Sequence, residues 1–321
     1  MGLWKLRLSM IGTLAFIIGL STLFFTVILS LVGAFDFITL GIFVVFFNIF
    51  QWLIGPYLID AMYHVKEVPR KDNPALYERV EGIAKRSGIK TPRIMLARIP
   101  IPNAFAYGSP IAGTRVAVTE GLTKTLSEDQ VDAVLGHELG HLRHKDVQVM
   151  MFASIMPALF YYIGYSTLLS SMFGRRDERN SGGAAVIGLA SMIIYFVLTL
   201  FTLYLSRLRE YYADRNGAMV VENGASKLSE ALARIQYSTG RIKKAYPQVG
   251  NFQSLKALFI ADPGQAEADA AAISQIGGLR TDHALVNEIL RKEVTSAARI
   301  TEIFSTHPNI IKRLRALKEL A

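Results

Sequence analysis

The sequence predicts a mainly α-helical integral membrane protein, in which four transmembrane helices accompany a polar α+β domain with a small sheet. Of the 321 residues, 51% are hydrophobic and 19% are charged, whereas soluble proteins carry about 25% charged residues. Asp, Glu, Lys and Arg are absent from four windows, residues 8–35, 37–59, 147–174 and 180–206. Each window exceeds the roughly 20 apolar residues that a helix needs to cross a bilayer. Four such stretches are hard to bury in the core of so short a chain, so we expect membrane spans.

The spans pair into two hairpins that divide the chain into four parts. Residues 1–59 form the first hairpin and residues 147–206 the second, with spans at about 8–33, 37–58, 147–172 and 184–206. Polar segments follow each hairpin, at residues 60–146 and 207–321. The first span is far longer than the 7–15-residue apolar core of a cleaved signal peptide, so we expect it to be retained.

The basic residues predict the orientation in the membrane. Lys5 and Arg7 precede the first span, which favours a cytoplasmic N-terminus. A hairpin of two spans separates the N-terminus from the first polar segment and the first polar segment from the second, so both segments and the C-terminus should also be cytoplasmic. The loop at residues 174–179 carries three arginines and opposes this orientation. Two acids accompany those arginines and earlier spans generally dominate, so we expect a multi-pass cell-membrane protein with a cytoplasmic polar domain.

Composition also limits the partners and the metal ligands. The formal net charge is +9, but the basic residues form no dense cluster with interleaved aromatics, so nucleic acid is not an expected partner. The positive charge fits polar segments that lie against the anionic surface of a lipid bilayer. The chain has no cysteine, so any bound metal must use nitrogen and oxygen ligands.

The first polar segment contains the pattern of a helix followed by a small sheet. The apolar spacing indicates a helix at residues 73–87 and strands at residues 93–98 and 114–119. Residues 100–107 between the strands should be extended, because a residue that precedes proline disfavours the helical conformation. Pro102 cannot donate to a strand ladder, so a strand here belongs at the edge of the sheet.

A helix with a metal-binding pattern comes next. Ser127 and Gln130 form a capping-box signature at its start. His137 and His141 are four residues apart, so their imidazoles project from one face, as two ligands of a zinc ion require. Glu138 can then act as general base without binding the metal. The alternative is a solvated helix face, but the residues next to the motif are uncharged.

A catalytic zinc ion takes three protein ligands and leaves its fourth position for water. His144 is the nearest candidate, but one helix cannot readily carry three ligands around a tetrahedral metal, so we expect His144 at the surface or behind the ligands. Glu210 is the better candidate, because the histidines precede the third span and Glu210 follows the fourth. A hairpin returns both segments to one membrane face, and helices that continue beyond the bilayer would place Glu210 opposite His137 and His141.

A second carboxylate, Asp214, lies four residues after Glu210 and therefore on the same helix face. We expect it behind the ligands, where a carboxylate accepts the free N–H of a ligand histidine and fixes its tautomer. An ordinary charged end of a membrane helix is the alternative, and it suits Arg207 and Arg209 better than the carboxylates.

These motifs resemble the HtpX family of membrane metalloendopeptidases, which is related to the CAAX prenyl endopeptidases. Four segments match the family in order, at residues 103–106, 134–141, 206–214 and 305–308, and Arg313 follows them. The resemblance covers nearly the whole chain and is weakest over residues 218–300. It implies a zincin-like metalloprotease domain of the gluzincin type with one zinc ion per subunit.

The resemblance also implies roles for individual residues. The zinc ligands would be His137, His141 and Glu210, with Glu138 as the base. An edge strand that pairs with substrate would contain Asn103, Ala104 and Phe105. His307 would stabilise the oxyanion, and Arg313 would pair with Asp214. Pairing through the main chain tolerates different substrate sequences. The residues themselves leave the role of His307 open, because His307 before Pro308 is as readily a helix cap.

The motif and the resemblance together predict a zinc metalloendopeptidase that hydrolyses peptide bonds at the cytoplasmic membrane surface. Its expected partners are the lipid bilayer and polypeptides, above all misfolded membrane proteins in quality control. A non-catalytic membrane scaffold is the main rival, and the intact Glu138 argues against it. A transporter would need ionisable residues inside the spans, which the four windows lack. Prenylated-peptide processing is disfavoured, because prenyl endopeptidases have a larger membrane part.

Overall fold

The structure is a computed structural model that describes residues 37–173, 181–245, 260 and 281–321. The chain divides into two compact units. One contains Met1–Trp52 and Gln148–Tyr204, and the other contains Leu53–Val147 and Leu205–Ala321. The predicted first span, residues 8–33, lies outside the described residues, so the predicted number of four spans rests on the sequence alone.

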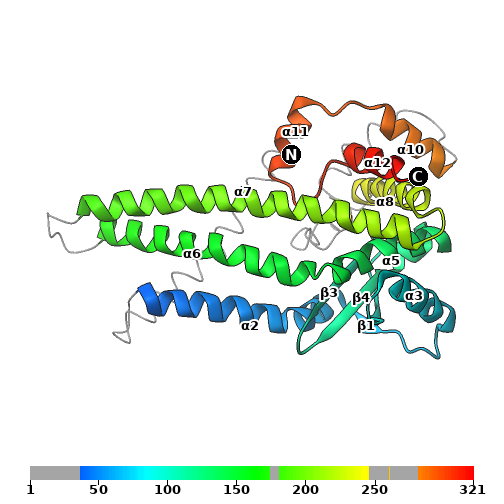
Figure 1. Ribbon diagram of the computed structural model, residues 1–321, viewed down its shortest axis with the longest axis horizontal. Helices are drawn as coiled ribbons and strands as arrows, with labels where there is room; N and C mark the ends of the chain where they lie inside the picture. Colours follow the sequence, from blue (N-terminus) through cyan, green and yellow to red (C-terminus); the bar gives the residue numbers. More distant parts are fainter. Residues whose placement is uncertain (1–36, 174–180, 246–259, 261–280) are drawn as a thin grey trace. The chain divides into compact units, whose positions relative to one another are not determined.

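Three long apolar helices are described, and all three contribute to the first unit. They are α2 (Phe37–Tyr63), α6 (Asp146–Phe173) and α7 (Ser181–Val220), all visible in Figure 1. Within the described residues these helices are long and apolar enough to cross a membrane, over Gly41–Tyr63, Asp146–Met172 and Gly183–Val220. They contain the predicted spans at 37–58, 147–172 and 184–206.

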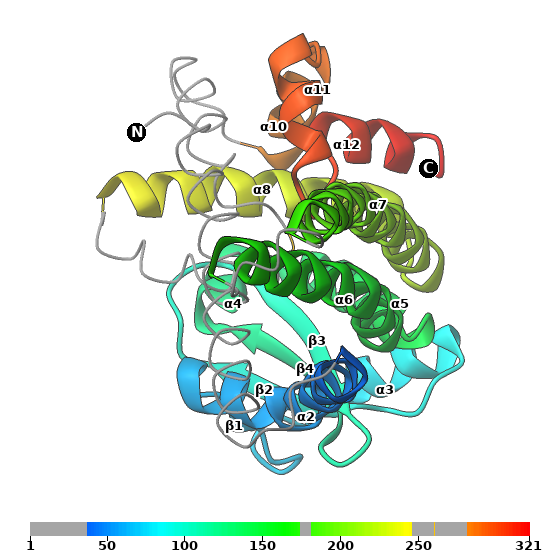
Figure 2. The same cartoon turned by 90° about the vertical axis from the view of Figure 1, so that its left-hand side faces the viewer.

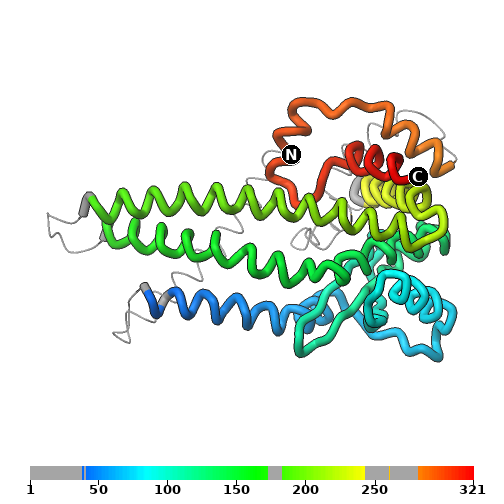
Figure 3. The backbone as a smooth tube through the Cα atoms, in the orientation of Figure 1, coloured from blue at the N-terminus to red at the C-terminus, as the bar shows by residue number. Residues whose placement is uncertain are grey.

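Helix α7 is much longer than a membrane span requires. Its 40 residues correspond to about 60 Å at 1.5 Å per residue, roughly twice the thickness of a bilayer core. Figure 3 shows it as one uninterrupted helix. The helix therefore carries Glu210 and Asp214 past the end of the predicted span at residue 206, as the sequence argument requires of the fourth span.

The same expectation is wrong for the helix that carries the histidines. This helix, α5 (Glu128–Arg143), ends before α6 begins at Asp146. His144 is its C-terminal cap, and Lys145 has a positive φ of 56°. A left-handed residue cannot continue a right-handed helix, so the chain turns between the motif and the third predicted span.

The second unit is built around a small mixed sheet. Its strands are β1 (Lys66–Glu67), β2 (Arg93–Ala97), β3 (Ala104–Ser109) and β4 (Gly113–Thr119). Their order is β1-β2-β4-β3 (Figure 2), with β2 parallel to β4 and the other pairs antiparallel. Among the described strands β3 lies at an edge, which confirms the prediction made from Pro102.

Helices complete the unit. They are α3 (Pro74–Ser87), α4 (Glu120–Thr125), α5, α8 (Gly224–Ala245), α10 (Asp282–Arg291), α11 (Ser296–Ile303) and α12 (Ile310–Lys318). Among them, α4 and α5 pack against the sheet. Helix α3 begins after an Asn73 cap and ends at Gly88, whose φ of 71° suits glycine. Helix α5 begins with the predicted capping box of Ser127 and Gln130.

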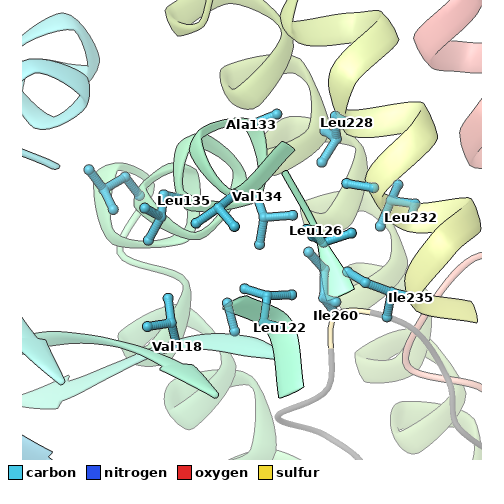
Figure 4. Packing of buried hydrophobic residues seen from close by; sticks show 14 of the residues in the cluster. Val118, Leu122, Leu126, Ala133, Val134, Leu135, Leu228, Leu232, Ile235 and Ile260 are labelled. Carbon is cyan, nitrogen blue, oxygen red and sulfur yellow. The ribbon is translucent and has the colours of Figure 1, made fainter. Parts of the chain in front are cut away.

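Helix α5 lies at the centre of the main hydrophobic core. It packs against α3, α8 and strand β3, and Figure 4 shows Val134 and Leu135 of α5 among the buried side chains. Leu228 and Leu232 of α8 belong to the same cluster and are fully buried. Burial of each leucine side chain stabilises the folded state by about 1.5–3 kcal/mol. On α5, the residues that face away from this hydrophobic core carry the polar site.

Two glycines let α5 approach the end of α7 that belongs to the same unit. A Cβ atom on Gly136 would lie 3.1 Å from the Cα atom of Gly217. A Cβ atom on Gly140 would lie 2.9 Å from both the Cα atom of Ala213 and the Cβ atom of Asn216. The two backbones are therefore close at the level of the histidines.

Replacing Gly140 with Ala is expected to destabilise the protein by about 1–3 kcal/mol, because the added methyl group overfills a packed contact. Thermal unfolding of the purified protein measures this loss. Gly82→Ala on α3 is the matched control. Its Cβ would meet only the flexible Nη1 atom of Arg86, at 3.4 Å. Alanine in that helix should be neutral or stabilising, and an equal loss in both variants would contradict the packing argument.

Candidate active site

The two motif histidines lie side by side on consecutive turns of α5. Their Nε2 atoms are 3.2 Å apart, and the rings are perpendicular. His137 is completely buried, whereas His141 is partly exposed. Both Nε2 atoms thus point to one place, as the four-residue spacing predicted.

Glu210 enters the same place from α7. Its Oε1 atom lies 3.5 Å from Nε2 of His141, and its Oε2 atom lies 3.8 Å from Nε2 of His137. Oε2 is buried without a hydrogen bond. Ligands bound about 2.0–2.1 Å from one tetrahedral zinc ion are roughly 3.3 Å apart. The spacing of these three side chains therefore fits a metal ion.

Glu138 extends this cluster of potential ligands. Its Oε1 atom lies 4.0 Å from Nε2 of His137, and the group of His137, Glu138 and His141 could itself hold a metal ion. Its Oε2 atom, however, accepts a hydrogen bond from the backbone N–H of Ala106 on β3, at 2.9 Å. Glu210 is close to both histidines, so its geometry suits a third ligand better than that of Glu138.

Burial has a direct effect on the Glu138 carboxylate. The side chain is almost completely removed from solvent, which raises the pKa of Glu138 above its usual value, while His137 and His141 oppose that rise. A carboxylate with a raised pKa is a stronger base. The environment of Glu138 therefore favours acceptance of a proton.

The surroundings of His141 favour positive charge. Burial alone would lower the pKa of His141, but the hydrogen bond to Asp146 and the charges of Glu210 and Glu138 raise it to about 9. The carboxylates that favour a proton on the imidazole would equally favour a metal cation in the same place. This electrostatic preference agrees with the spacing of the ligand atoms.

Asp214 lies behind His137, and Arg313 lies behind Asp214. Oδ1 of Asp214 is 2.9 Å from Nδ1 of His137, a close approach without ideal hydrogen-bond geometry. Arg313 donates two hydrogen bonds to this carboxylate, from Nε at 2.9 Å and from Nη2 at 2.6 Å. Its Nη1 atom also lies 3.1 Å from Oε2 of Glu210. Arg313 thus contacts both acids of the α7 face.

Asp146 is a further member of the site that sequence reasoning missed. Its Oδ2 atom lies 2.6 Å from Nδ1 of His141, and Arg209 binds its Oδ1 atom. Arg209 also donates to the carbonyl oxygen of His144, at 2.8 Å. The turn at Lys145 brings Asp146 back towards the motif. A continuous helix would carry it away, so sequence spacing gave no usable signal for it.

His307 reaches the cluster from the loop before α12. The side chain is buried, and its Nε2 atom lies 3.7 Å from Oε1 of Glu210. Its Nδ1 atom is 3.0 Å from Oγ1 of Thr306. The residue that caps α12 is Asn309, whose side chain accepts from the N–H of Ile311. The alternative of a helix-capping His307 is therefore wrong.

The other described histidines lie away from the metal-binding cluster. His144 is 2.9 Å from the carbonyl oxygen of Gly140 through Nδ1, and its ring contacts Tyr212. His283 is exposed beside Asn287. His64 is also exposed, directly after α2. The position of His144 agrees with the expectation that it lies at the surface or behind the ligands.

The predicted substrate-binding segment is buried and leads into β3, an edge strand of the described sheet. Asn103 is buried, and its side chain accepts from the backbone N–H of Ile260, at 3.0 Å. Asn103 also pairs with Thr119 of β4, as Phe105 pairs with Ala117. Alternate residues of an antiparallel edge strand direct their main-chain groups outward. The N–H of Ala106 is outward, and it binds Glu138.

Comparison with known proteins identifies the family of this chain. The sequence model of peptidase family M48 matches residues 70–321, which include every side chain of the cluster. The chain belongs to peptidase family M48. Family M48 consists of metalloproteases, in agreement with a cluster that could hold a metal ion.

Curated relatives extend the M48 assignment over nearly the whole chain. Protease HtpX homolog 2 of Sulfurisphaera tokodaii is 36% identical over 340 residues, which cover 98% of this chain and 97% of the relative. Protease HtpX homolog of Thermoplasma acidophilum is 36% identical over 293 residues, with 88% and 85% covered. Protease HtpX homolog of Archaeoglobus fulgidus is 33% identical over 320 residues, with 99% and 88% covered.

A solved structure supports the M48 fold. The crystal structure of S. mikatae Ste24p matches with a TM-score of 0.53 and 18% sequence identity. The match covers 98% of this chain and 66% of the Ste24p chain. This likeness concerns the fold alone. The family model, the curated relatives and the apolar helices identify an HtpX-like M48 membrane protease.

Proposed function

We propose that this chain is a membrane-bound zinc endopeptidase that cleaves polypeptides at the cytoplasmic face of the membrane. The observation that supports it best is the convergence of three side chains. Nε2 of His137 and Nε2 of His141 are 3.2 Å apart, and the Glu210 carboxylate lies within 3.8 Å of both. We infer that these three residues are the zinc ligands.

In this proposal Glu138 is the general base. A zinc ion bound at the cluster supplies Lewis acidity, which polarises a carbonyl group and acidifies water. Oε1 of Glu138, the oxygen nearer the histidines, accepts the proton of the attacking water and passes it to the leaving amine nitrogen. The N–H of Ala106 holds the other oxygen, at 2.9 Å, and so fixes the direction of the carboxylate.

The remaining polar side chains support this chemistry through contacts with the proposed ligands and with one another. Asp214 and Asp146 each face the Nδ1 atom of one ligand histidine, which leaves Nε2 as the metal-binding nitrogen. Arg313 holds Asp214 in place through two hydrogen bonds. We assign His307, which lies near Glu210, the role of donor to the oxyanion that forms during attack.

Substrate would bind as an additional strand along β3. The outward main-chain groups of Ala104 and the carbonyl oxygen of Ala106 would pair with an extended polypeptide, since the N–H of Ala106 holds Glu138. Asn103, Ala104 and Phe105 would shape the start of this edge. Such pairing uses the main chain and tolerates many side chains. Broad tolerance suits a protease of misfolded membrane proteins, the quality-control role we propose.

We further propose that the peptidase domain consists of residues 60–146 and 207–321. The membrane hairpins would then be residues 1–59 and 147–206, with both termini in the cytoplasm. A cysteine introduced at the exposed Lys71 tests the orientation, because the chain has no other cysteine. The introduced cysteine should react with a membrane-impermeant thiol reagent only after the cells are opened. Reaction in intact cells would reverse the assigned orientation.

Metal analysis and cleavage assays test the central proposal. The purified full-length protein should contain one zinc ion per chain and cleave casein or an unfolded membrane protein. A chelator should abolish cleavage, and added zinc should restore it. Glu210→Ala should lose the metal as well as the activity. A chain without zinc that still cleaves at the original rate would disprove the metal mechanism, and a zinc-loaded chain without activity would favour the scaffold.

Asp146 provides a separate prediction about metal affinity. Replacing Asp146 with Asn is expected to weaken zinc binding by about 10–100-fold, because residues that orient a ligand imidazole typically contribute that much. Competition with a chromophoric chelator measures the change. Asp132→Asn on α5, the helix that carries His141, is the control, since Asp132 pairs with Arg79 outside the cluster. Equal zinc affinities in both variants would remove Asp146 from the site.

A further inference from the structure

The β3–β4 hairpin follows the last part of α2 towards the predicted membrane span. The hydroxyl of Tyr107 donates to Oδ1 of Asp60, at 2.5 Å. Two residues further along β3, the hydroxyl of Ser109 donates to the carbonyl oxygen of Leu53, at 3.0 Å. The partners on α2 are seven residues apart and come in the opposite order. Strand β3 therefore runs antiparallel to the helix over about 10 Å.

The charges along this contact are neutralised within it. Arg115 of β4 pairs with Asp60 and is only 4% exposed. Its guanidinium group stacks on the rings of Tyr57 and Tyr107, at 5.2 Å and 5.9 Å from their centroids. Ionisable groups at membrane depth are normally paired in this way. Tyrosine is also enriched at the interface between membrane and water.

The end of the hairpin is apolar and lies level with the span. Leu53 belongs to the candidate span Gly41–Tyr63 and lies five residues before the end of the predicted apolar stretch at residue 58, about 7–8 Å along the helix. Residues 109–113, the hairpin tip, carry no charged side chain. Ile111 at this tip is 61% exposed.

A basic side chain, that of Arg93, lies beside the hairpin tip. Arg93 of β2 donates to the carbonyl oxygen of Ala112 and is about half exposed, with Glu67 at 3.6 Å. An arginine next to an apolar tip can bind lipid phosphate while the tip enters the acyl layer. A single exposed isoleucine would need no explanation in water. Its position level with a membrane helix is what identifies the surface.

We propose that the hairpin tip, residues 109–113, inserts into the lipid bilayer beside α2 and anchors the sheet to the membrane. The occupant of this surface is the outer part of the lipid acyl layer, and Ile111 is the residue that enters it. Ala106, whose N–H binds Glu138, lies three residues before Ser109, about 10 Å along the strand. If the proposed peptidase function holds, strand β3 extends from the bilayer to the general base Glu138. The substrates of the protein are then chain segments that emerge from the membrane.

Site-directed spin labelling tests this insertion without relying on activity. The chain has no cysteine, so Ile111→Cys accepts a single nitroxide in the full-length protein, reconstituted into phosphatidylcholine–phosphatidylglycerol bilayers. Phe46→Cys on the exposed apolar face of α2 is the lipid reference, and Lys71→Cys in an exposed turn is the aqueous reference. Collisions with oxygen and with a water-soluble nickel complex report the surroundings of each label.

The label at residue 111 should behave like the one at residue 46, accessible to oxygen and protected from nickel. Nickel accessibility like that of residue 71 would overturn the proposal, and protection from both reagents would show that protein covers the tip. Ile111→Trp, in a chain with Trp4 and Trp52 changed to Phe, provides a second measurement. Lipids brominated near the headgroup should quench its fluorescence at least threefold more than aqueous iodide does, and the reverse order would also overturn insertion.

Discussion

Replacing Glu138 with Gln is expected to lower the rate of peptide hydrolysis by about 10²–10⁴-fold, the usual contribution of a general base. Glutamine keeps the size of the side chain and can still accept from the N–H of Ala106, the 2.9 Å contact of Glu138. It cannot accept a proton from water. The variant should therefore retain its fold, its zinc and its affinity for substrate, and lose kcat.

The measurement is kcat and KM on casein or an unfolded membrane protein, with zinc content determined on the same samples. Glu120→Gln is the matched control, because Glu120 lies on α4 and pairs with Lys124 at the surface. That change should leave kcat within about twofold, as a surface pair contributes little. Wild-type turnover in Glu138→Gln would show that another group is the base. Loss of zinc in this variant would instead make Glu138 a ligand.

Replacing Arg313 with Met is expected to destabilise the protein by about 3–5 kcal/mol, as removal of one partner from a buried ion pair generally does. Arg313 is 1% exposed and makes two hydrogen bonds to Asp214. It also donates to the carbonyl oxygen of Ile260, at 2.7 Å, and lies near Glu210. Methionine fills part of the space but leaves two buried carboxylates without their counter-charge.

Thermal or denaturant unfolding of the detergent-solubilised protein measures this change. Arg315→Met provides a close control, because Arg315 lies on the same helix but is exposed and, among the described residues, donates to the carbonyl oxygen of Lys292. It should change stability by no more than about 0.5 kcal/mol. Adding Asp214→Asn to Arg313→Met should recover part of the loss, since it removes one unpaired charge. Equal stability of both arginine variants would contradict the role given to Arg313.

Much of the fold was predictable because local rules act over short distances. The capping box of Ser127 and Gln130 depends on residues three apart, and Pro102 alone was enough to predict that β3 lies at a sheet edge. Uncharged windows predicted the three long apolar helices that the structure describes. These features need only the chemistry of neighbouring residues.

The meeting of distant segments was predictable only where topology constrained it. A membrane hairpin returns the chain to the face it left, which was enough to pair Glu210 with His137 and His141 from sequence. The turn at Lys145 was not predictable in this way, because lysine rarely adopts a positive φ and no sequence signal marks it. Asp146 was missed for the same reason.

The sequence by itself determined the chemistry that is possible: two imidazoles on one helix face, two carboxylates on another, and no thiolate. It determined these because the period of a helix fixes which residues share a face. Only the tertiary structure decided which oxygen of Glu138 is held by Ala106, that Asp146 faces His141, and that the hairpin tip lies beside Leu53. Such contacts depend on how elements far apart in sequence pack, which no local pattern records.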